Sequence, residues 1–282
     1  MNRLHRISLS QPRHISIVAH RGNTAQVKSE NTIEAFSAAM SILGECNTHS
    51  GIPQIEFDLR LSRDGYVIIY HDRTIDGMEV SDLDYPQLQS MAQSKGFEIP
   101  LFEDLLKLCR DFVPAPLQRR IALDIEIKEE GYEERVIALA TQYLSYDNFV
   151  IKSFNDASVR KIKDLDPQIK VGLLLGKVTG KFPLLSILTQ FFPEYRIIKT
   201  GADFVAPHFR LLRFGFLWRM KLMNIEVFVW TVNEERRLVK LLKSKYIAAV
   251  ITDRPELALA IVARLDRSKS LNQPKVRRLP AR

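Results

Sequence analysis

The feature that most constrains the fold is a repeated alternation of short apolar runs with amphipathic segments of helical length. Nine such runs, rich in β-branched residues, lie at residues 15–19, 55–59, 66–70, 121–127, 149–153, 170–175, 203–206, 227–230 and 249–252. Strands that alternate with helices predict a parallel sheet with helical crossovers, and roughly eight units predict closure into a barrel. We therefore expect an α/β fold with one barrel domain over residues 14–267.

Two regions depart from this pattern. The residues between the runs at 55–59 and 66–70 are too few for a crossover helix. We therefore expect an irregular barrel around residues 55–70; the alternative is that one of the two strands forms a hairpin arm. Residues 268–282 are polar and basic and contain prolines, a composition that predicts a disordered tail.

The charge balance indicates an anionic partner. The formal net charge is +8, from 41 Lys and Arg against 33 Asp and Glu. Such an excess favours phosphate esters, anionic membrane surfaces or nucleic acid. No nucleic-acid-binding motif accompanies the charge, so we do not expect a nucleic-acid partner. The oligomeric state is left open.

The two cysteines, Cys46 and Cys109, form no CxxC spacing. This pattern predicts neither a disulfide framework nor a zinc site and favours a reducing, cytoplasmic compartment. We expect no signal peptide, and no segment reaches the about 18 apolar residues that a membrane span needs.

Two expected strands carry charged residues at alternate positions, Glu56, Asp58 and Arg60 in the first and Asp124, Glu126 and Lys128 in the second. Alternate residues of a barrel strand share a face, so these charges face the barrel interior. Buried carboxylates require compensation by a metal, a cation or hydrogen bonds. Glu56, Asp58 and Glu126 would suit Mg²⁺ or Ca²⁺. A purely structural ion-pair network of Arg60, Lys128 and Asp124 is the alternative, and strand geometry does not choose between them.

Two histidines terminate strands on the side where these carboxylates gather. His20 and His71 could serve as general acid and general base, because an imidazole titrates near neutrality. Arg21 and Lys128 would neutralise phosphoryl oxygens. Trp230 ends another strand, where it would either pack in the core or close over a ligand.

Three polar residues have spacings typical of helix starts. Asn31 precedes Glu34 by three residues, and Asp253 precedes Glu256 by three, the spacing of a capping box. Asn233 is expected to cap the helix after Trp230. Glu30 lies outside these patterns and is a second-tier site candidate, as is Asp124.

Several short motifs together resemble the glycerophosphodiester phosphodiesterase family. They are AHRG (19–22), ENT (30–32), EFDLRLSRDG (56–65), YHD (70–72), IEIK (125–128), SF (153–154), WTVN (230–233) and TDRP (252–255). The match keeps the same order from residue 16 to about 260.

The resemblance implies a TIM (β/α)8 barrel and metal-dependent cleavage of glycerophosphodiesters to glycerol 3-phosphate and an alcohol. It implies that His20 and His71 form the acid–base pair and that Arg21 contacts the phosphate, with Lys128 near it. Three carboxylates, Glu56, Asp58 and Glu126, correspond to the ligands of one divalent cation. The neighbouring glycerol hydroxyl would attack phosphorus, and water would open the resulting cyclic phosphate.

The chain departs from the family pattern at three places: Ser29 replaces the usual proline before ENT, the loop from His20 to Glu30 differs, and the stretch after His71 is short. That last region often carries an inserted subdomain that shapes substrate access. Headgroup preference is therefore open. There are three alternatives. Two of them are a membrane-associated lysophospholipase D and a non-catalytic barrel that binds phosphate esters or lipids. The third is a phosphatidylinositol-specific phospholipase C, but the intact set of carboxylates argues against it.

Two segments that follow expected strands are unusually apolar. Residues 176–196 include twelve successive uncharged residues from Phe182 to Pro193, and residues 207–223 mix aromatic residues with Arg and Lys. Both leave the carboxyl ends of strands, where the active site of a barrel lies. They would either pack on the barrel or dip into an anionic membrane surface, which would admit lysophospholipids.

Overall fold

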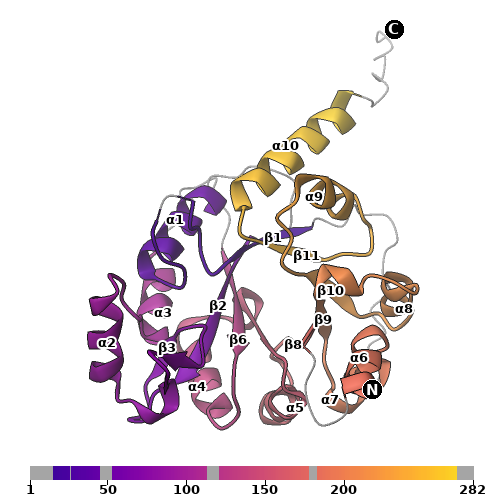
Figure 1. The fold of residues 1–282 in the computed structure, drawn as a ribbon. Coiled ribbons are helices and arrows are strands. Elements are labelled where there is room, and N and C mark those ends of the chain that lie inside the picture. The colour runs from indigo at the N-terminus through magenta and orange to yellow at the C-terminus, as the bar shows by residue number, and fades with distance from the viewer. Residues whose placement is uncertain (1–14, 26, 45–52, 113–120, 178–182, 272–282) are drawn as a thin grey trace, which may run out of the picture.

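The computed structural model describes residues 15–25, 27–44, 53–112, 121–177 and 183–271. Eight parallel strands form a closed barrel (Figure 1). They are β1 (Ser16–His20), β2 (Gln54–Leu61), β6 (Ala122–Ile127), β7 (Phe149–Ser153), β8 (Val171–Leu175), β9 (Phe204–Pro207), β10 (Glu226–Val229) and β11 (Ala249–Thr252). Each strand pairs in parallel with the next, and β11 pairs with β1 to close the ring. The predicted TIM barrel is confirmed.

Helices surround the barrel on its outer side (Figure 1). They are α1 (Ile33–Gly44), α3 (Phe102–Asp111), α4 (Glu133–Tyr143), α5 (Asp156–Leu165), α6 (Pro183–Phe191), α7 (Glu194–Thr200), α8 (Phe216–Leu222), α9 (Glu235–Leu242) and α10 (Pro255–Leu271). Short 3₁₀ helices occur at η2 (Tyr146–Asn148) and η3 (Phe209–Leu211). The helix α10 continues past residue 268, where the tail was expected to begin, and residues 272–282 lie outside the described residues.

The surplus strand of the sequence pattern is a hairpin arm, which was the alternative to an irregular barrel strand. The strand β3 (Val67–Ile69) pairs antiparallel with the end of β2, with Leu59 opposite Ile69. A small subdomain follows, made of β4 (Thr74–Ile75), β5 (Met78–Glu79), η1 (Val80–Asp82) and α2 (Tyr85–Ser94). Its core includes Ile68, Leu88 and Ile99, and the half-buried rings of Tyr70 and Phe97 pack against it. This subdomain lies beside the barrel mouth on the His71 side.

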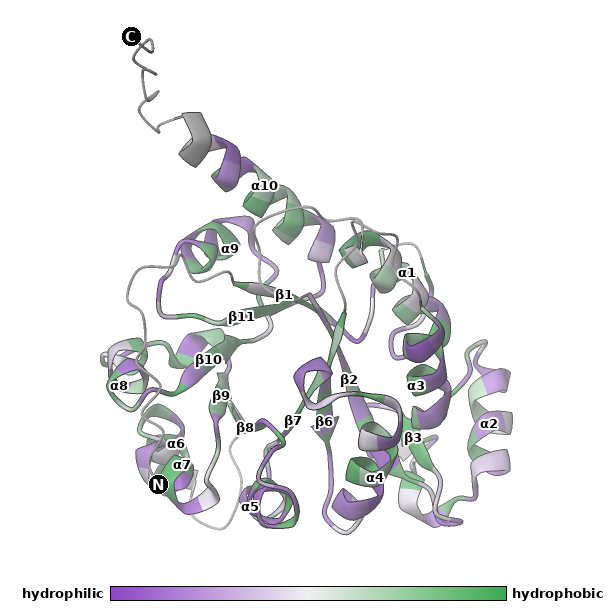
Figure 2. Ribbon diagram, turned by 180° about the vertical axis from the view of Figure 1, so that it is seen from behind, coloured by the Kyte–Doolittle hydropathy of each residue, from purple (hydrophilic) through white to green (hydrophobic). Residues whose placement is uncertain are grey.

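The alternating strand pattern divides the barrel core into two layers. Leu123, Ile125 and Ile127 point outward into the large core between strands and helices, and the ribbon in Figure 2 accordingly shows helices that mix hydrophobic and hydrophilic residues. A second apolar cluster fills the interior, where the rings of Phe204 and Phe228 stack with centroids 4.3 Å apart. The charged residues of β2 and β6 lie on this interior side, as the two-residue periodicity predicts.

Candidate active site

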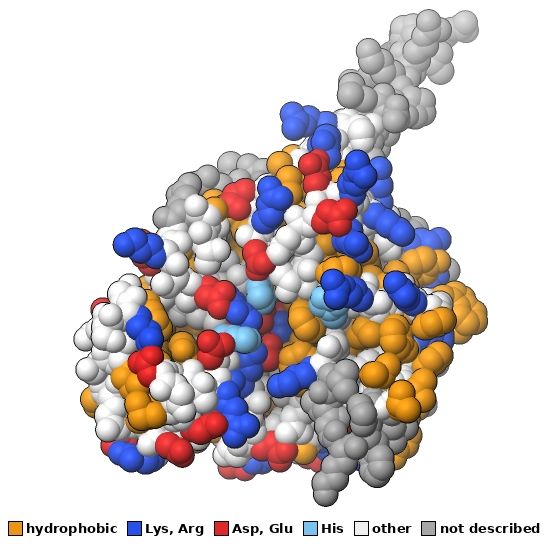
Figure 3. Space-filling view, viewed as in Figure 1, with side chains coloured by type: hydrophobic (Ala, Val, Ile, Leu, Met, Phe, Trp, Pro, Cys, Tyr) orange, Lys and Arg blue, Asp and Glu red, His pale blue; other side chains and the backbone are white. Residues whose placement is uncertain are grey.

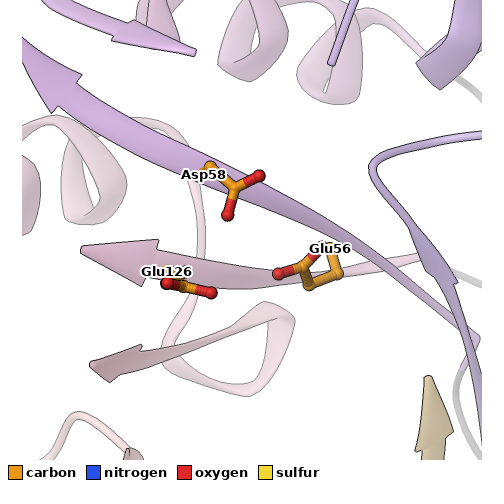
Figure 4. A group of neighbouring side chains, drawn as sticks. All are labelled: Glu56, Asp58 and Glu126. Atoms are coloured by element: carbon orange, nitrogen blue, oxygen red, sulfur yellow. The ribbon is translucent and has the colours of Figure 1, made fainter. Parts of the chain in front are cut away.

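Three carboxylates meet inside the barrel. Glu56 and Asp58 on β2 and Glu126 on β6 each offer an oxygen, and these oxygens lie within 4.8 Å of one another (Figure 4). The strand register creates this arrangement, because Asp58 lies opposite Glu126 in the parallel pair β2–β6. All three side chains are buried. The group predicted from sequence is therefore assembled in one place.

Two lysines and an arginine compensate these charges. The ammonium of Lys128 lies 2.7 Å from Oδ1 of Asp58 and 2.6 Å from Oε1 of Glu126. Arg21 Nε lies 3.1 Å from Oδ2 of Asp58. An ion-pair network is thus present around the same carboxylates, but Arg21 takes part in it in place of the expected Arg60, which pairs with Glu129.

The second lysine, Lys152 on β7, was not found by sequence reasoning. It is 1% exposed, and its ammonium lies 2.6 Å from Oδ2 of Asp124 and 3.4 Å from Oε1 of Glu56. Asp124 therefore pairs with Lys152 and not with Lys128. The available signal was the lysine in the apolar run FVIKS (149–153), on a strand next to β6.

The pKa values of two carboxylates in this group, Glu126 and Asp58, are shifted in opposite directions. Burial, together with the charges of Asp58 and Glu56, raises the pKa of Glu126 to about 7 against the opposing effect of Lys128. Burial raises the pKa of Asp58 too, but Lys128 and Arg21 outweigh it and hold that pKa well below its usual range. Burial is the largest cause at Glu126, and the neighbouring carboxylates add to it within the same site. Its all-oxygen donor set fits a hard divalent cation.

Backbone geometry, as well as side-chain chemistry, explains the sequence His20–Arg21–Gly22 at the end of β1. Arg21 has φ +54° and Gly22 has φ +88°. A Cβ on Gly22 would lie 2.8 Å from the backbone of Ala35 in α1. The turn places the Arg21 guanidinium over Asp58 and lets Arg21 Nη1 donate to Glu30 Oε1 at 2.5 Å. Glu30 therefore acts on the site by holding Arg21.

His20 is the residue at the carboxyl end of β1. Its Nδ1 donates to Oδ1 of Asp253 at 2.5 Å, and its Nε2 lies 3.8 Å from Oε2 of Glu56. Burial lowers the His20 pKa, but Glu56 and the hydrogen bond to Asp253 outweigh it, so the pKa is raised from its ordinary value. Because Nδ1 is committed to Asp253, Nε2 is the nitrogen that faces the site.

His71 follows β3 on the opposite side of the carboxylates. Its Nδ1 lies 2.7 Å from Oδ1 of Asp72, and Arg60 donates two hydrogen bonds to its backbone carbonyl. Burial and the charge of Lys128 lower the pKa of His71. The two imidazoles thus lie at different edges of one acidic cluster, in different electrostatic environments.

Three residues interpreted as helix caps have other roles. Asn31 donates to Oδ2 of Asp58 at 2.9 Å, whereas Thr32 accepts from the first turn of α1. Asp253 binds His20, and Asn233 accepts from the backbone of Asp253 and donates to its carboxylate. Local spacing suggested caps, but each side chain reaches a partner far away in the sequence.

Trp230 is packed and also lines the site. Its Nε1 donates to the carbonyl of Ala206 at 2.7 Å, and its ring meets the Phe154 ring edge to face at 5.8 Å. Both rings line a cavity of about 120 Å³ together with His20, His71 and the charged cluster. The two predicted alternatives for Trp230, core packing and ligand contact, are therefore compatible.

A larger cavity of about 500 Å³ adjoins this one, and His71 lines both. Figure 3 shows histidine, acidic and basic side chains gathered near the centre of this face of the molecule. His71 therefore lies between the two cavities.

Comparison with known proteins agrees with this geometry. The model of the glycerophosphoryl diester phosphodiesterase family matches residues 20–257. The chain belongs to this family. A glycerophosphodiester phosphodiesterase from Caldanaerobacter subterraneus subsp. tengcongensis is 26% identical over 265 residues, which cover 87% of this chain and 97% of the relative. One from Bacillus subtilis is 26% identical over 282 residues, 89% of this chain and 87% of that protein.

Solved structures of the family share the fold. A glycerophosphodiester phosphodiesterase from Parabacteroides distasonis superposes with a TM-score of 0.70 at 20% identity, covering 90% of this chain and all (100%) of that one. An Oleispira antarctica phosphodiesterase, solved in complex with the product sn-glycerol-3-phosphate, has a TM-score of 0.67 at 21% identity, covering 88% of this chain and 96% of that one. At these identities the likeness shows the barrel fold.

Proposed function

We propose that this chain hydrolyses glycerophosphodiesters to glycerol 3-phosphate and an alcohol. The observation that carries the proposal is a small cavity lined by two imidazoles, the cations Arg21 and Lys128, and two carboxylates of the buried triad, whose third member, Asp58, lies directly beside them. This set matches the chemistry that a phosphodiester requires, because it offers proton transfer on both sides of phosphorus and positive charge for the phosphoryl oxygens. Family membership supports the same reaction.

The carboxylates Glu56, Asp58 and Glu126 would hold one divalent cation, Mg²⁺ or Ca²⁺. When bound, such a cation supplies Lewis-acid polarisation of a phosphoryl oxygen. Lys128 would contribute to the same charge stabilisation, since its ammonium already bridges Asp58 and Glu126.

The cavities suggest a division of roles between the histidines. His20 lines only the smaller cavity, and Asp253 fixes its Nδ1, so Nε2 would accept the proton of the glycerol hydroxyl that attacks phosphorus. His71 lines both cavities and would donate a proton to the alcohol oxygen as its bond to phosphorus breaks. Water would then open the cyclic phosphate with the two roles reversed, because the second step mirrors the first.

The experiment is a coupled assay of glycerol 3-phosphate release from a panel of glycerophosphodiesters, with and without chelator. We expect release that is lost in chelator and restored by Mg²⁺ or Ca²⁺. Release that is unchanged in chelator would remove the metal role. A protein that binds the divalent cation in calorimetry but releases glycerol 3-phosphate from none of the diesters would instead support the non-catalytic phosphate-ester or lipid-binding barrel.

A second candidate, action on lysophospholipids at a membrane, is favoured by one surface. We call the exposed apolar side chains of α6, α7, α8 and the adjoining loop the apolar lip; they are Leu184, Ile187, Leu188, Phe192, Tyr195, Ile198, Phe214, Trp218 and Leu222. Figure 3 shows hydrophobic side chains grouped over this region. None of the described helices combines the length and hydrophobicity that a bilayer crossing requires, so contact would be peripheral.

The charge of the lip suits an anionic bilayer. Lys199, Arg210, Arg213 and Lys221 are exposed beside it. Residues 183–201 and 207–223 contain one acidic residue, Glu194, which is ion-paired with Arg219. Apolar side chains flanked by cations are typical of segments that insert at a lipid interface.

A vesicle-pelleting assay tests the membrane role. The double variant Leu188→Ser with Trp218→Ser should lose binding to vesicles rich in anionic lipid, while Leu165→Ser with Met78→Ser, a pair of exposed apolar residues elsewhere, should bind as wild type does. If the lip variant binds the vesicles as well as the control variant and wild type do, lipid docking is contradicted. Self-association without vesicles, lost in the lip variant alone, would show that the lip is an interface between copies of the chain.

A further inference from the structure

The cavity of about 500 Å³ on the far side of His71 has no role in the chemistry described above. It lies between Thr24 and residues 28–31 on one side and the end of β3, the residues after it and residues 97–98 on the other. Because His71 lines this cavity as well as the smaller one, a group that leaves phosphorus beside His71 enters it directly. The cavity is therefore placed to receive the alcohol of the diester.

Two aromatic rings form one wall of this cavity. Tyr70 and Phe97 stack with their planes 7° apart and their centroids 6.3 Å apart. Both rings are held from behind by the small core under α2, so they present a fixed surface. Burial and the charge of Asp72 raise the pKa of Tyr70, which keeps its phenol neutral at physiological pH. An aromatic face attracts cations, and such faces recognise quaternary ammonium groups.

The carboxylates around this wall also favour a positively charged ligand. Glu30, Asp72 and Glu98 line the cavity, against one lysine, Lys28. Glu30 is paired with Arg21 and Asp72 with His71. Glu98 is exposed, and no hydrogen bond or ion pair joins it to any other residue in the described part of the chain. It is next to Phe97, so an aromatic ring and a free carboxylate adjoin each other at the wall.

We propose that this cavity is the subsite for the leaving alcohol and that it selects glycerophosphodiesters whose alcohol carries an ammonium group, such as choline or ethanolamine. The proposal rests on the phosphodiesterase function proposed above and names its substrate class. Tyr70 and Phe97 provide the aromatic surface, and Glu98 provides the counter-charge. Neutral alcohols such as glycerol or inositol gain neither interaction.

The first experiment compares two substrates. Wild-type protein should show a higher kcat/KM for glycerophosphocholine than for glycerophosphoglycerol. Glu98→Gln should lower the value for glycerophosphocholine about fivefold, the scale of one partly screened charge pair, and leave glycerophosphoglycerol within about twofold. Phe97→Leu should also act selectively on the cationic substrate, because it removes the ring but keeps an apolar side chain. Glu134→Gln, an exposed carboxylate on α4 outside the cavity, is the matched control.

The second experiment does not depend on turnover. Choline chloride is titrated into wild-type and Glu98→Gln protein and followed by ligand-observed NMR, with glycerol as the neutral probe. Saturable choline binding that is weakened by Glu98→Gln supports the subsite.

The two experiments separate the subsite from the reaction. Equal turnover of both substrates by wild type, equal loss on both in Glu98→Gln, or no saturable choline binding would overturn the subsite. Choline binding that depends on Glu98, in a protein that releases no glycerol 3-phosphate, would retain the cation site and refute the proposed reaction.

Discussion

The buried pair Lys152–Asp124 offers a direct test of how the acidic barrel interior is stabilised. Lys152 is 1% exposed and Asp124 is 0% exposed, and their charged atoms lie 2.6 Å apart. Lys152→Met keeps the apolar part of the side chain and removes the ammonium. The substitution leaves the buried carboxylate of Asp124 without its cation. The neighbouring Glu56 also loses a cation, since the Lys152 ammonium lies 3.4 Å from its carboxylate.

The loss in the free energy of unfolding depends on which buried charges each substitution leaves without a partner. Removing one partner of a buried ion pair costs about 3 to 5 kcal/mol, so Lys152→Met should lower the free energy of unfolding by that amount. Asp124→Asn should cost less, about 2 kcal/mol, because Lys152 keeps Glu56 as a partner. The double variant removes both charges and should be more stable than the sum of the single effects by at least about 2 kcal/mol.

The assay is urea unfolding followed by circular dichroism in the presence of chelator, so that no added cation compensates Asp124 or Glu56. Lys107→Met, on the exposed face of α3, is the control and should leave the unfolding midpoint unchanged. Additive effects in the double variant would refute the conclusion that Lys152 and Asp124 stabilise the fold as a pair.

Three further predictions concern other parts of the barrel. His20→Ala and His71→Ala should each lower turnover of glycerophosphodiesters at least about a hundredfold, the scale of acid–base catalysis; near-normal turnover in either variant would overturn the role of that histidine. Gly172→Ala should destabilise the protein by about 2 to 3 kcal/mol, because its Cβ would lie 2.2 Å from the Phe204 ring, and an unchanged midpoint of thermal unfolding would contradict this. Burial raises the pKa of the Cys109 thiol to about 12, so alkylation of Cys109, measured by peptide mass spectrometry, should be slow at pH 8 and increase with pH; labelling at the rate of free cysteine would disprove the burial.

Some of the fold and site could be read from the sequence because they depend on local periodicity. The alternation of strands and helices predicted the barrel, and the two-residue alternation around Glu56, Asp58 and Glu126 predicted which side chains face its interior. The short interval between the runs at 55–59 and 66–70 excluded a crossover helix and left two possibilities, an irregular barrel strand or a hairpin arm such as β3. Each of these features is fixed by residues a few positions apart, so the chain alone contains the information.

Only the tertiary structure decided which partner each polar side chain meets. Asn31, Asn233 and Asp253 have the local spacing of helix caps, yet Asn31 binds Asp58 and Asp253 binds His20, 27 and 233 residues away in the chain. Lys152 reaches Asp124 because barrel closure sets β7 beside β6 in one register.

The larger cavity likewise exists only after the hairpin arm and its subdomain have packed beside the barrel. Sequence periodicity determines the face on which a side chain lies, whereas its contacts depend on the strand register and packing of elements that are distant in the chain. That difference is why the barrel and its acidic interior were predictable, and why Lys152 and the cavity beside His71 were not.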